Sequence, residues 1–240
     1  MVLPSTRGCP IYEFKPRVSF GNDLLLPAGY YGIRVPAGLS QSSVPAPNFV
    51  NPATMVSLLQ SPGHGHGRGI GVTHGLTTTE FAVCFSNFAR QWRQVNTRAS
   101  VPSWQFQGGD VFFEVTITVY VLEGDRPQPN DDLSRQLFAI IMEHELLHVL
   151  DEIDIVNRWM APQTYQDNMV LRYLSNAGPV DNAMFQSWFR GRGFSNWLKD
   201  GLWTPEHNRR GGIRDAPNQY AALQRKIDDI RIQMTNLPSP

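Results

Sequence analysis

The stretch of sequence that decides the fold is Met142-Glu143-His144-Glu145-Leu146-Leu147-His148-Val149-Leu150. It contains the pattern H-E-x-x-H, in which His144 and His148 are four residues apart. On an α-helix, residues at this spacing lie on the same face, so both imidazoles can bind one metal ion. Glu145 follows the first histidine, where a carboxylate can take a proton from a water on that ion. The pattern therefore predicts a helix that carries a hydrolytic zinc site.

The neighbouring residues indicate that this helix is buried on one side. Residues 137–142 are apolar throughout, and Leu146 and Leu147 stand between the two histidines. The alternative interpretation is a surface helix with two incidental histidines. Uncompensated histidines rarely lie on a helix that runs through a core, which favours a metal site. Asp131 or Asp132 is expected to cap the start of this helix.

A catalytic zinc site needs a third protein ligand besides the two histidines and a water. Three acids follow closely: Asp151, Glu152 and Asp154. On a straight helix Glu152 lies about 12 Å from His144, which is too far for a shared ion. Asp151 is nearly two turns from His144 and also fits poorly. Asp154 can reach the ion only if the helix ends near residues 150–152.

Residues 144–154 resemble the metzincin signature H-E-x-x-H-x-x-G-x-x-H of the zincin metallopeptidases. The resemblance implies a peptidase whose third zinc ligand is Asp154, an Asp-for-His exchange found in some members of that clan. It also implies that Met160 is the methionine below the metal and that Tyr165 contacts the metal or the oxyanion. The chain departs from the signature at Asp151, because the signature has a glycine there that permits a sharp helix exit.

The third ligand has alternatives in later segments, as in the gluzincin and aspzincin clans. The resemblance covers only about residues 133–165, and Glu206 is the only glutamate after Glu152. Asp167 and Asp181 are further candidates. The identity of the third ligand therefore stays open among Asp154, Asp181, Asp167, Glu206 and Glu152.

Two periodic stretches precede the H-E-x-x-H helix. The aromatic residues between 78 and 97 recur at helical spacing, and Thr77 with Glu80 matches a capping box, which predicts a helix. Residues 111–121 alternate between apolar and polar, which predicts a strand with one buried face. This order of elements resembles that of a zincin catalytic domain. We therefore expect an α+β fold with a backing helix, a small mixed sheet and the metal-binding helix.

The chain divides by composition into two regions. Residues 1–75 are rich in proline, glycine and serine, which predicts a loop-rich N-terminal arm with short strands. Residues 76–240 are expected to form the zincin-like domain, with a helical C-terminal part. Helical patterns in that part cover residues 181–197 and about 217–236.

Composition excludes several classes of partner. The 240 residues carry no formal net charge and no basic clusters with interleaved aromatic residues, so we expect no nucleic-acid partner. No apolar run reaches the ~20 residues that span a membrane. The first residues lack the apolar segment of a signal peptide, so we expect a cytoplasmic protein or signal-independent export. The oligomeric state is not indicated.

The remaining cysteines and histidines carry weaker signals. Cys9 and Cys84 allow one disulfide but do not require it. His64, His66 and His74 lie in or after a glycine-rich segment. We expect these three to belong to a surface loop rather than to a second metal site.

The sequence thus predicts a zinc-dependent metallopeptidase that acts on proteins or peptides, with a secreted or toxin-type effector as one setting. Glu145 would take the proton from the zinc-bound water and pass it to the leaving amine, while Tyr165 would help to stabilise the oxyanion. The alternatives are a zinc amide hydrolase that is not a peptidase and a zinc-stabilised binding module without catalysis. Glu145 argues against the binding module, because a structural zinc site has no use for that carboxylate.

Overall fold

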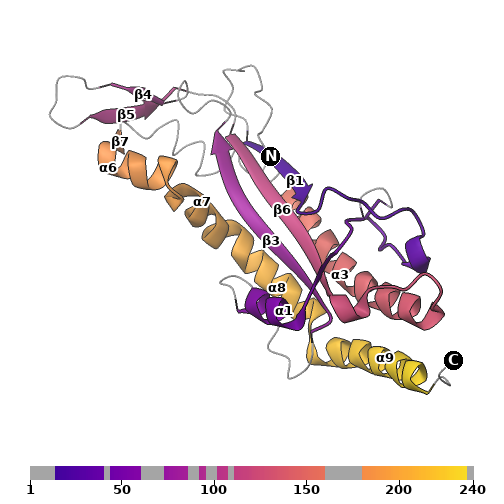
Figure 1. Cartoon of the computed structure of the whole chain (residues 1–240). Coiled ribbons are helices and arrows are strands. Elements are labelled where there is room, and N and C mark those ends of the chain that lie inside the picture. The colour runs from indigo at the N-terminus through magenta and orange to yellow at the C-terminus, as the bar shows by residue number, and fades with distance from the viewer. Residues whose placement is uncertain are drawn as a thin grey trace. The chain divides into compact units, whose positions relative to one another are not determined.

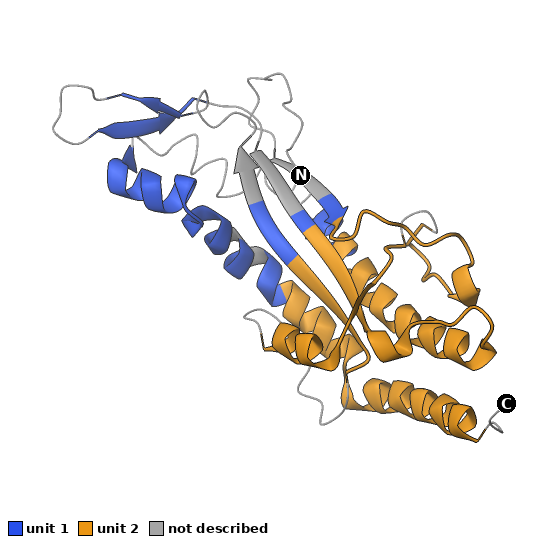
Figure 2. Cartoon of the chain, viewed as in Figure 1, with its two compact units in different colours: residues 1–19, 80–115, 154–205 blue, residues 20–79, 116–153, 206–240 orange. Residues whose placement is uncertain are grey.

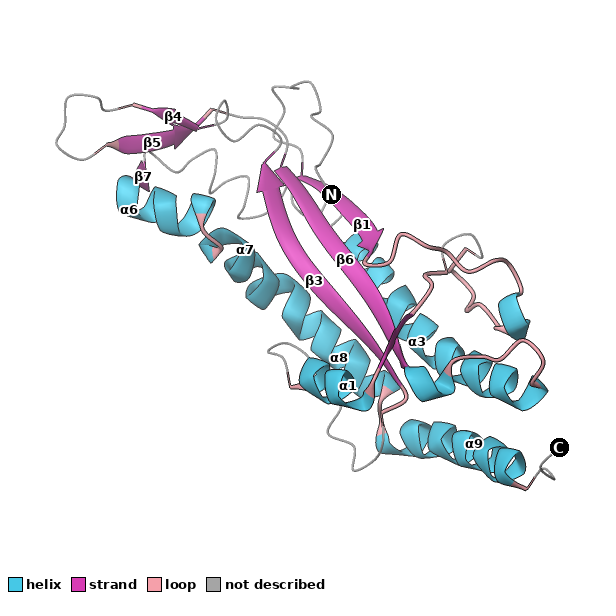
Figure 3. Cartoon of the chain, in the orientation of Figure 1, coloured by secondary structure: helices cyan, strands magenta, loops and turns pink. Residues whose placement is uncertain are grey.

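The structure is a computed structural model, and it describes residues 14–40, 44–60, 73–85, 92–95, 102–107, 111–159 and 180–236. These residues form both helices and strands (Figures 1 and 3). The chain has two compact units, shown in Figure 2. Unit 1 comprises residues 1–19, 80–115 and 154–205, and unit 2 comprises residues 20–79, 116–153 and 206–240. The boundary predicted at residue 75 falls inside unit 2.

The strands are β1 (Phe14–Phe20), β2 (Asn48–Val50), β3 (Gly75–Phe85), β4 (Trp92–Gln94), β5 (Ser103–Phe106), β6 (Val111–Leu122) and β7 (Val180–Asp181). The longer helices are α1 (Pro52–Leu59), α3 (Asp132–Trp159), α8 (Thr204–Arg214) and α9 (Pro217–Thr235). Short helical pieces are η1 (Tyr30–Gly32), η3 (Glu123–Asp125), α6 (Asn182–Met184), η4 (Phe185–Arg190), α7 (Gly193–Leu198) and η5 (Lys199–Trp203). Strand β6 pairs with β1, β2 and β3, and a second sheet has the order β4-β5-β7.

Helix α3 confirms the helix predicted around H-E-x-x-H. Its start is capped by Asp131, whose Oδ1 accepts hydrogen bonds from the backbone N–H of Leu133 at 3.0 Å and of Ser134 at 3.2 Å. One side of the helix is fully buried: Phe138, Met142, Leu146 and Val149 each have 0% of their surface exposed. This apolar side anchors the helix and leaves the histidine side free to form a site.

Strand β6 confirms the strand predicted from alternation. Val115, Ile117, Val119 and Val121 are at most 1% exposed. β2 runs parallel to it, with Asn48 opposite Tyr120 and two further residue pairs in register. A central strand with a wholly buried valine and isoleucine face is typical of a sheet covered by a helix.

The backing helix predicted over residues 78–97 is wrong. Residues Gly75–Phe85 form β3, and Trp92–Gln94 form β4. The aromatic residues four apart are also an even number apart, so they fit the period of a strand as well as that of a helix. The three β-branched residues at 77–79 favour the strand. Thr77 therefore does not cap a helix.

One helix near the N-terminus was not predicted, whereas the helix predicted near the C-terminus is present. The N-terminal region contains α1, which the sequence did not predict and which Asn51 caps by accepting a hydrogen bond from the Thr54 N–H at 2.9 Å. The helix predicted near residues 217–236 is confirmed as α9, with Ile227 and Ile230 buried. Within the described residues, no helix is long and apolar enough to cross a membrane.

Candidate metal centre

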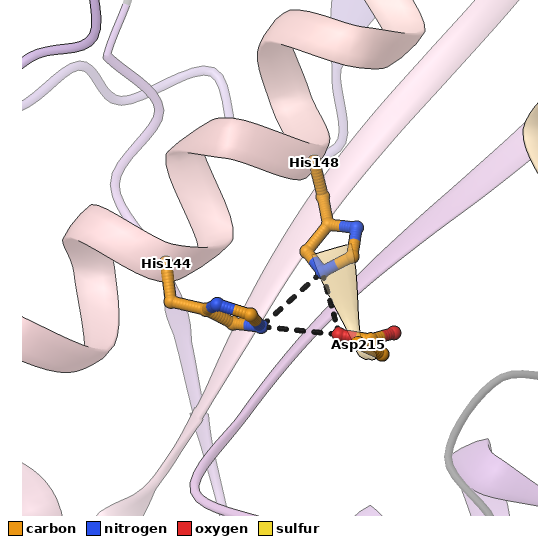
Figure 4. Close-up of side chains that lie close together, drawn as sticks. All are labelled: His144, His148 and Asp215. Atoms are coloured by element: carbon orange, nitrogen blue, oxygen red, sulfur yellow. Dashed lines mark hydrogen bonds and ion pairs between the residues drawn. The ribbon is translucent and has the colours of Figure 1, made fainter. Parts of the chain in front are cut away.

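The two histidines of the motif meet one carboxylate in unit 2. His144 and His148 extend from one face of α3 toward Asp215 (Figure 4). Their Nε2 atoms are 3.3 Å apart. Asp215 Oδ1 lies 3.2 Å from each of them. The three atoms therefore form a nearly equilateral triangle.

The size of this triangle fits a zinc ion. Zinc binds nitrogen and oxygen at ~2.0–2.1 Å in tetrahedral geometry, which places ligand atoms about 3.3 Å apart. The three observed distances match that spacing within about 0.1 Å. Two imidazoles and a carboxylate are also a ligand set that catalytic zinc sites use, with the fourth position left for water. The residues present therefore fit a zinc ion.

Asp215 comes from the short connection between α8 and α9. Its backbone N–H donates to the carbonyl of Gly211 at 2.8 Å, and α9 begins two residues later with Pro217. Sequence reasoning missed this residue, because it is 67 positions after His148 and carries no motif of its own. Its only local signal was an acid placed just before a helix that starts with proline.

The three groups stabilise one another electrostatically. Burial opposes ionisation of Asp215, but hydrogen bonds from His144 and His148 outweigh it and hold the pKa of the carboxyl well below its usual value. Burial works against the charged form of His148, yet the hydrogen bond that its imidazole donates to Asp215 and the nearby carboxylates raise the pKa of the imidazole. The site therefore contains an ionised carboxylate and strongly favours positive charge.

Glu145 lies beside the triangle and is held by β3. Its side chain is buried, and the hydroxyl of Thr77 donates to Oε2 at 2.7 Å. A Cβ atom built at Gly75 would lie only 2.6 Å from Glu145 Oε1, so the backbone of β3 packs closely against the carboxylate. The side chain predicted as general base is thus fixed at the edge of the site.

The structure does not bring Asp154 to the two histidines. Helix α3 continues to Trp159, so the predicted exit near residues 150–152 is absent. Six residues of helix correspond to about 9 Å of rise beyond His148. The carboxylate of Asp154 instead pairs with Arg158 at 2.5 Å.

The other candidate ligands have different partners. Glu152 pairs with His207 at 2.5 Å. Glu206 accepts hydrogen bonds from two arginines, and these bonds lower its pKa to about 2. Asp181 caps α6 by accepting a hydrogen bond from the Met184 N–H at 2.7 Å. The predicted positions Tyr165, Asp167 and Met160 lie outside the described residues.

A cavity of about 510 Å³ opens beside the triangle within unit 2. The start of β3, the middle of α3, the end of α8 and the first turns of α9 surround it. Tyr220 of α9 lines this cavity together with the two histidines, Glu145 and Asp215. Burial raises the pKa of the Tyr220 hydroxyl, and the carboxylates of Asp215 and Glu145 raise it further, although a hydrogen bond with Thr73 works in the opposite direction. Tyr220 is a second functional candidate that sequence reasoning missed.

His74 is not a free surface histidine. It is 5% exposed, and its Nδ1 lies 2.8 Å from Asp125 Oδ2. Arg231 donates to the other oxygen of that carboxylate at 2.6 Å. His74 therefore belongs to a buried ion-pair cluster on the cavity wall, whereas His64 and His66 lie outside the described residues. Cys9 also lies outside them.

Comparison with protein-family models gives no match, and comparisons with curated proteins and with solved structures give none either.

Proposed function

We propose that this chain is a zinc-dependent hydrolase that cleaves peptide bonds, with His144, His148 and Asp215 as the zinc ligands. The observation that carries the proposal is the triangle of two Nε2 atoms and one carboxylate oxygen at 3.2–3.3 Å. A small ion with short bonds to all three groups fits that spacing. The cavity beside the triangle leaves room for a water and a substrate.

When bound, the zinc ion supplies Lewis-acid chemistry that lets water attack at neutral pH. Glu145 has the role of proton acceptor and later proton donor to the leaving amine. Thr77 holds one oxygen of that carboxylate, which leaves the other oxygen for the proton. A general base that is fixed in advance loses little entropy when the reaction begins.

The position of β3 favours an extended peptide as substrate. Among the described strands, β3 pairs only with β6, and its first residues line the cavity. No second described strand pairs with β3, so a peptide can add its backbone on the side away from β6, as in other strand-addition complexes. This geometry favours peptide substrates over the alternative of a small non-peptide amide.

Tyr220 is proposed as a group that stabilises the oxyanion. Tyr220 lines the same cavity as Glu145 and Asp215, and the raised pKa of its hydroxyl keeps that group protonated and able to donate a hydrogen bond. The role assigned to Tyr165 from the resemblance stays a prediction.

The direct test is hydrolysis of an unfolded protein by the zinc-loaded chain, followed by mass spectrometry of the products. Glu145→Gln is expected to retain zinc and lose turnover by at least about 10²-fold, because it removes the proton acceptor. Glu123→Gln, at an exposed position that does not line the cavity, is the control and is expected to keep full activity. Equal activity of wild type and Glu145→Gln would contradict the proposal.

A further inference from the structure

We propose that Asp151 and Arg214 form a clamp that positions the third zinc ligand. The inference rests on the proposed function and assigns a role to a contact outside the ligand set. Arg214 Nε donates to Asp151 Oδ2 at 2.8 Å, and Arg214 Nη2 donates to Oδ1 at 3.0 Å. This two-bond geometry fixes the direction of the guanidinium as well as its distance.

Each residue of the clamp lies close in sequence to one of the proposed zinc ligands. Asp151 lies three residues after His148, so it is one turn further along the same helix. Arg214 immediately precedes Asp215 in the chain. Locking Asp151 to Arg214 therefore fixes the backbone that carries Asp215 relative to the helix that carries the histidines.

Neighbouring contacts place the rest of α8 against the same part of α3. Arg210 Nη1 lies 3.5 Å from the backbone oxygen of Asp151 and 3.7 Å from its Oδ1. His207 Nδ1 lies 2.5 Å from Glu152 Oε1. These contacts hold α8 alongside α3. The Asp151–Arg214 contact holds the residue that immediately precedes Asp215.

Asp151 is also the position at which residues 144–154 differ from the metzincin signature that they resemble. Asp151 stands where that signature has a glycine. In this chain the helix continues through the position, and the Asp151 carboxylate points to α8. At Asp151 the helix therefore continues instead of turning, and the third proposed ligand, Asp215, comes from a later segment of the chain.

The clamp is expected to matter for zinc affinity more than for overall stability. Partly exposed ion pairs add little to the folding of a domain. Zinc ligands, however, must be held closely in place, and loss of a residue that orients them typically lowers metal affinity about 10–100-fold.

The test is the zinc dissociation constant, measured by competition with a chromophoric chelator, for wild type, Asp151→Asn, Arg214→Gln and the double variant. Arg209→Gln is the matched control, because Arg209 lies on the same helix and pairs with Glu206 rather than with Asp151. Both single variants are expected to bind zinc about 10–100-fold more weakly, whereas the control binds as wild type.

The double variant should bind zinc no more weakly than the single variants, since each single variant already removes the same interaction. Arg214→Lys should recover part of the affinity.

The melting temperature of the metal-free proteins separates positioning from a general structural role. We expect the clamp variants to melt at the temperature of Arg209→Gln. Unchanged zinc affinity in both clamp variants would overturn the clamp and leave the proposed function intact. A fall in affinity that follows an equal fall in metal-free stability would also overturn it. Absence of zinc binding by wild type would overturn both.

Discussion

At the level of single residues, the proposed chemistry depends on how closely β3 approaches the general base. Gly75 has no side chain, and this allows the strand to lie against Glu145 and Ile141. Thr77, two residues on, points to the same side and holds the carboxylate. The first residues of β3 therefore contact Glu145 as well as forming part of the sheet.

Gly75→Ala is expected to lower activity while zinc binding persists. The added methyl group would lie 2.6 Å from Glu145 Oε1 and 2.9 Å from Ile141 Cγ2, so the carboxylate must move. Overpacking of this kind costs about 1–3 kcal/mol. The measurements are kcat, zinc content and urea unfolding, with Gly124→Ala as control because no atom lies within 4 Å of its added Cβ. Full activity of Gly75→Ala would contradict this view of Glu145.

Tyr220→Phe is expected to lower kcat by roughly 10²-fold, because it removes one hydrogen-bond donor to the developing oxyanion. KM and zinc content should change little, since the ring remains and the hydroxyl is not a ligand in the triangle. Steady-state kinetics with one peptide substrate, at a fixed zinc concentration, provide the test. A loss expressed wholly in KM would indicate substrate binding rather than stabilisation of the oxyanion.

Local spacing allowed part of the site to be predicted, and tertiary structure supplied the rest. His144, Glu145 and His148 follow from one turn of helix, so their arrangement is a property of five consecutive residues. Asp215 is brought in by the contact of α8 with α3, which no local pattern encodes. The same holds for Tyr220, because its role depends on the cavity that α9 helps to form.

At the level of elements, α3 and β6 were predictable because their buried positions repeat with a single period. β3 was not, because its aromatic residues fit two periods and the sheet decided between them. The third-ligand prediction followed from the assumed end of α3. Since α3 continues to Trp159, Asp154 remains on the helix surface beside Arg158.

Asp131→Ala is expected to lower the free energy of unfolding by about 1 kcal/mol, because the first turn of α3 loses its cap. Zinc content should not change, since His144 lies more than three turns further along the helix. Asp132→Ala is the control, because its exposed carboxylate pairs with Arg135 and does not cap. Urea unfolding measures both variants. Equal effects of the two would contradict the assignment of the cap to Asp131.

At the level of the whole molecule, the described site residues all belong to unit 2, and that unit also contains a buried ion-pair cluster. Asp125 is 2% exposed and carries hydrogen bonds from His74 and Arg231. Burial opposes its ionisation, but these two hydrogen bonds outweigh burial and hold the pKa of Asp125 below its ordinary value of 3.8. The folded state therefore favours the ionised form.

Asp125→Asn is expected to destabilise the protein by about 3 kcal/mol at pH 7, because it leaves the guanidinium of Arg231 without its counter-charge. Because the pKa of Asp125 is lower in the folded state, its ionisation stabilises the fold at any pH above its pKa in the unfolded state. This stabilisation is lost as the pH falls through the pKa of the folded state. The difference between wild type and variant should therefore be constant above about pH 5 and shrink below pH 4. Urea unfolding across this range measures it, with Glu123→Gln as an exposed control that should change little. A difference that does not depend on pH would contradict the ionised state of Asp125.

The most direct test of the central claim is elemental analysis of zinc in wild type, Asp215→Ala and Asp154→Ala after purification without added metal and again after zinc is returned. We predict close to one zinc per chain in wild type and in Asp154→Ala, and weakened or lost zinc in Asp215→Ala. Loss of zinc from Asp154→Ala with retention in Asp215→Ala would contradict the ligand set. Absence of zinc in wild type after reloading would contradict the metal centre itself.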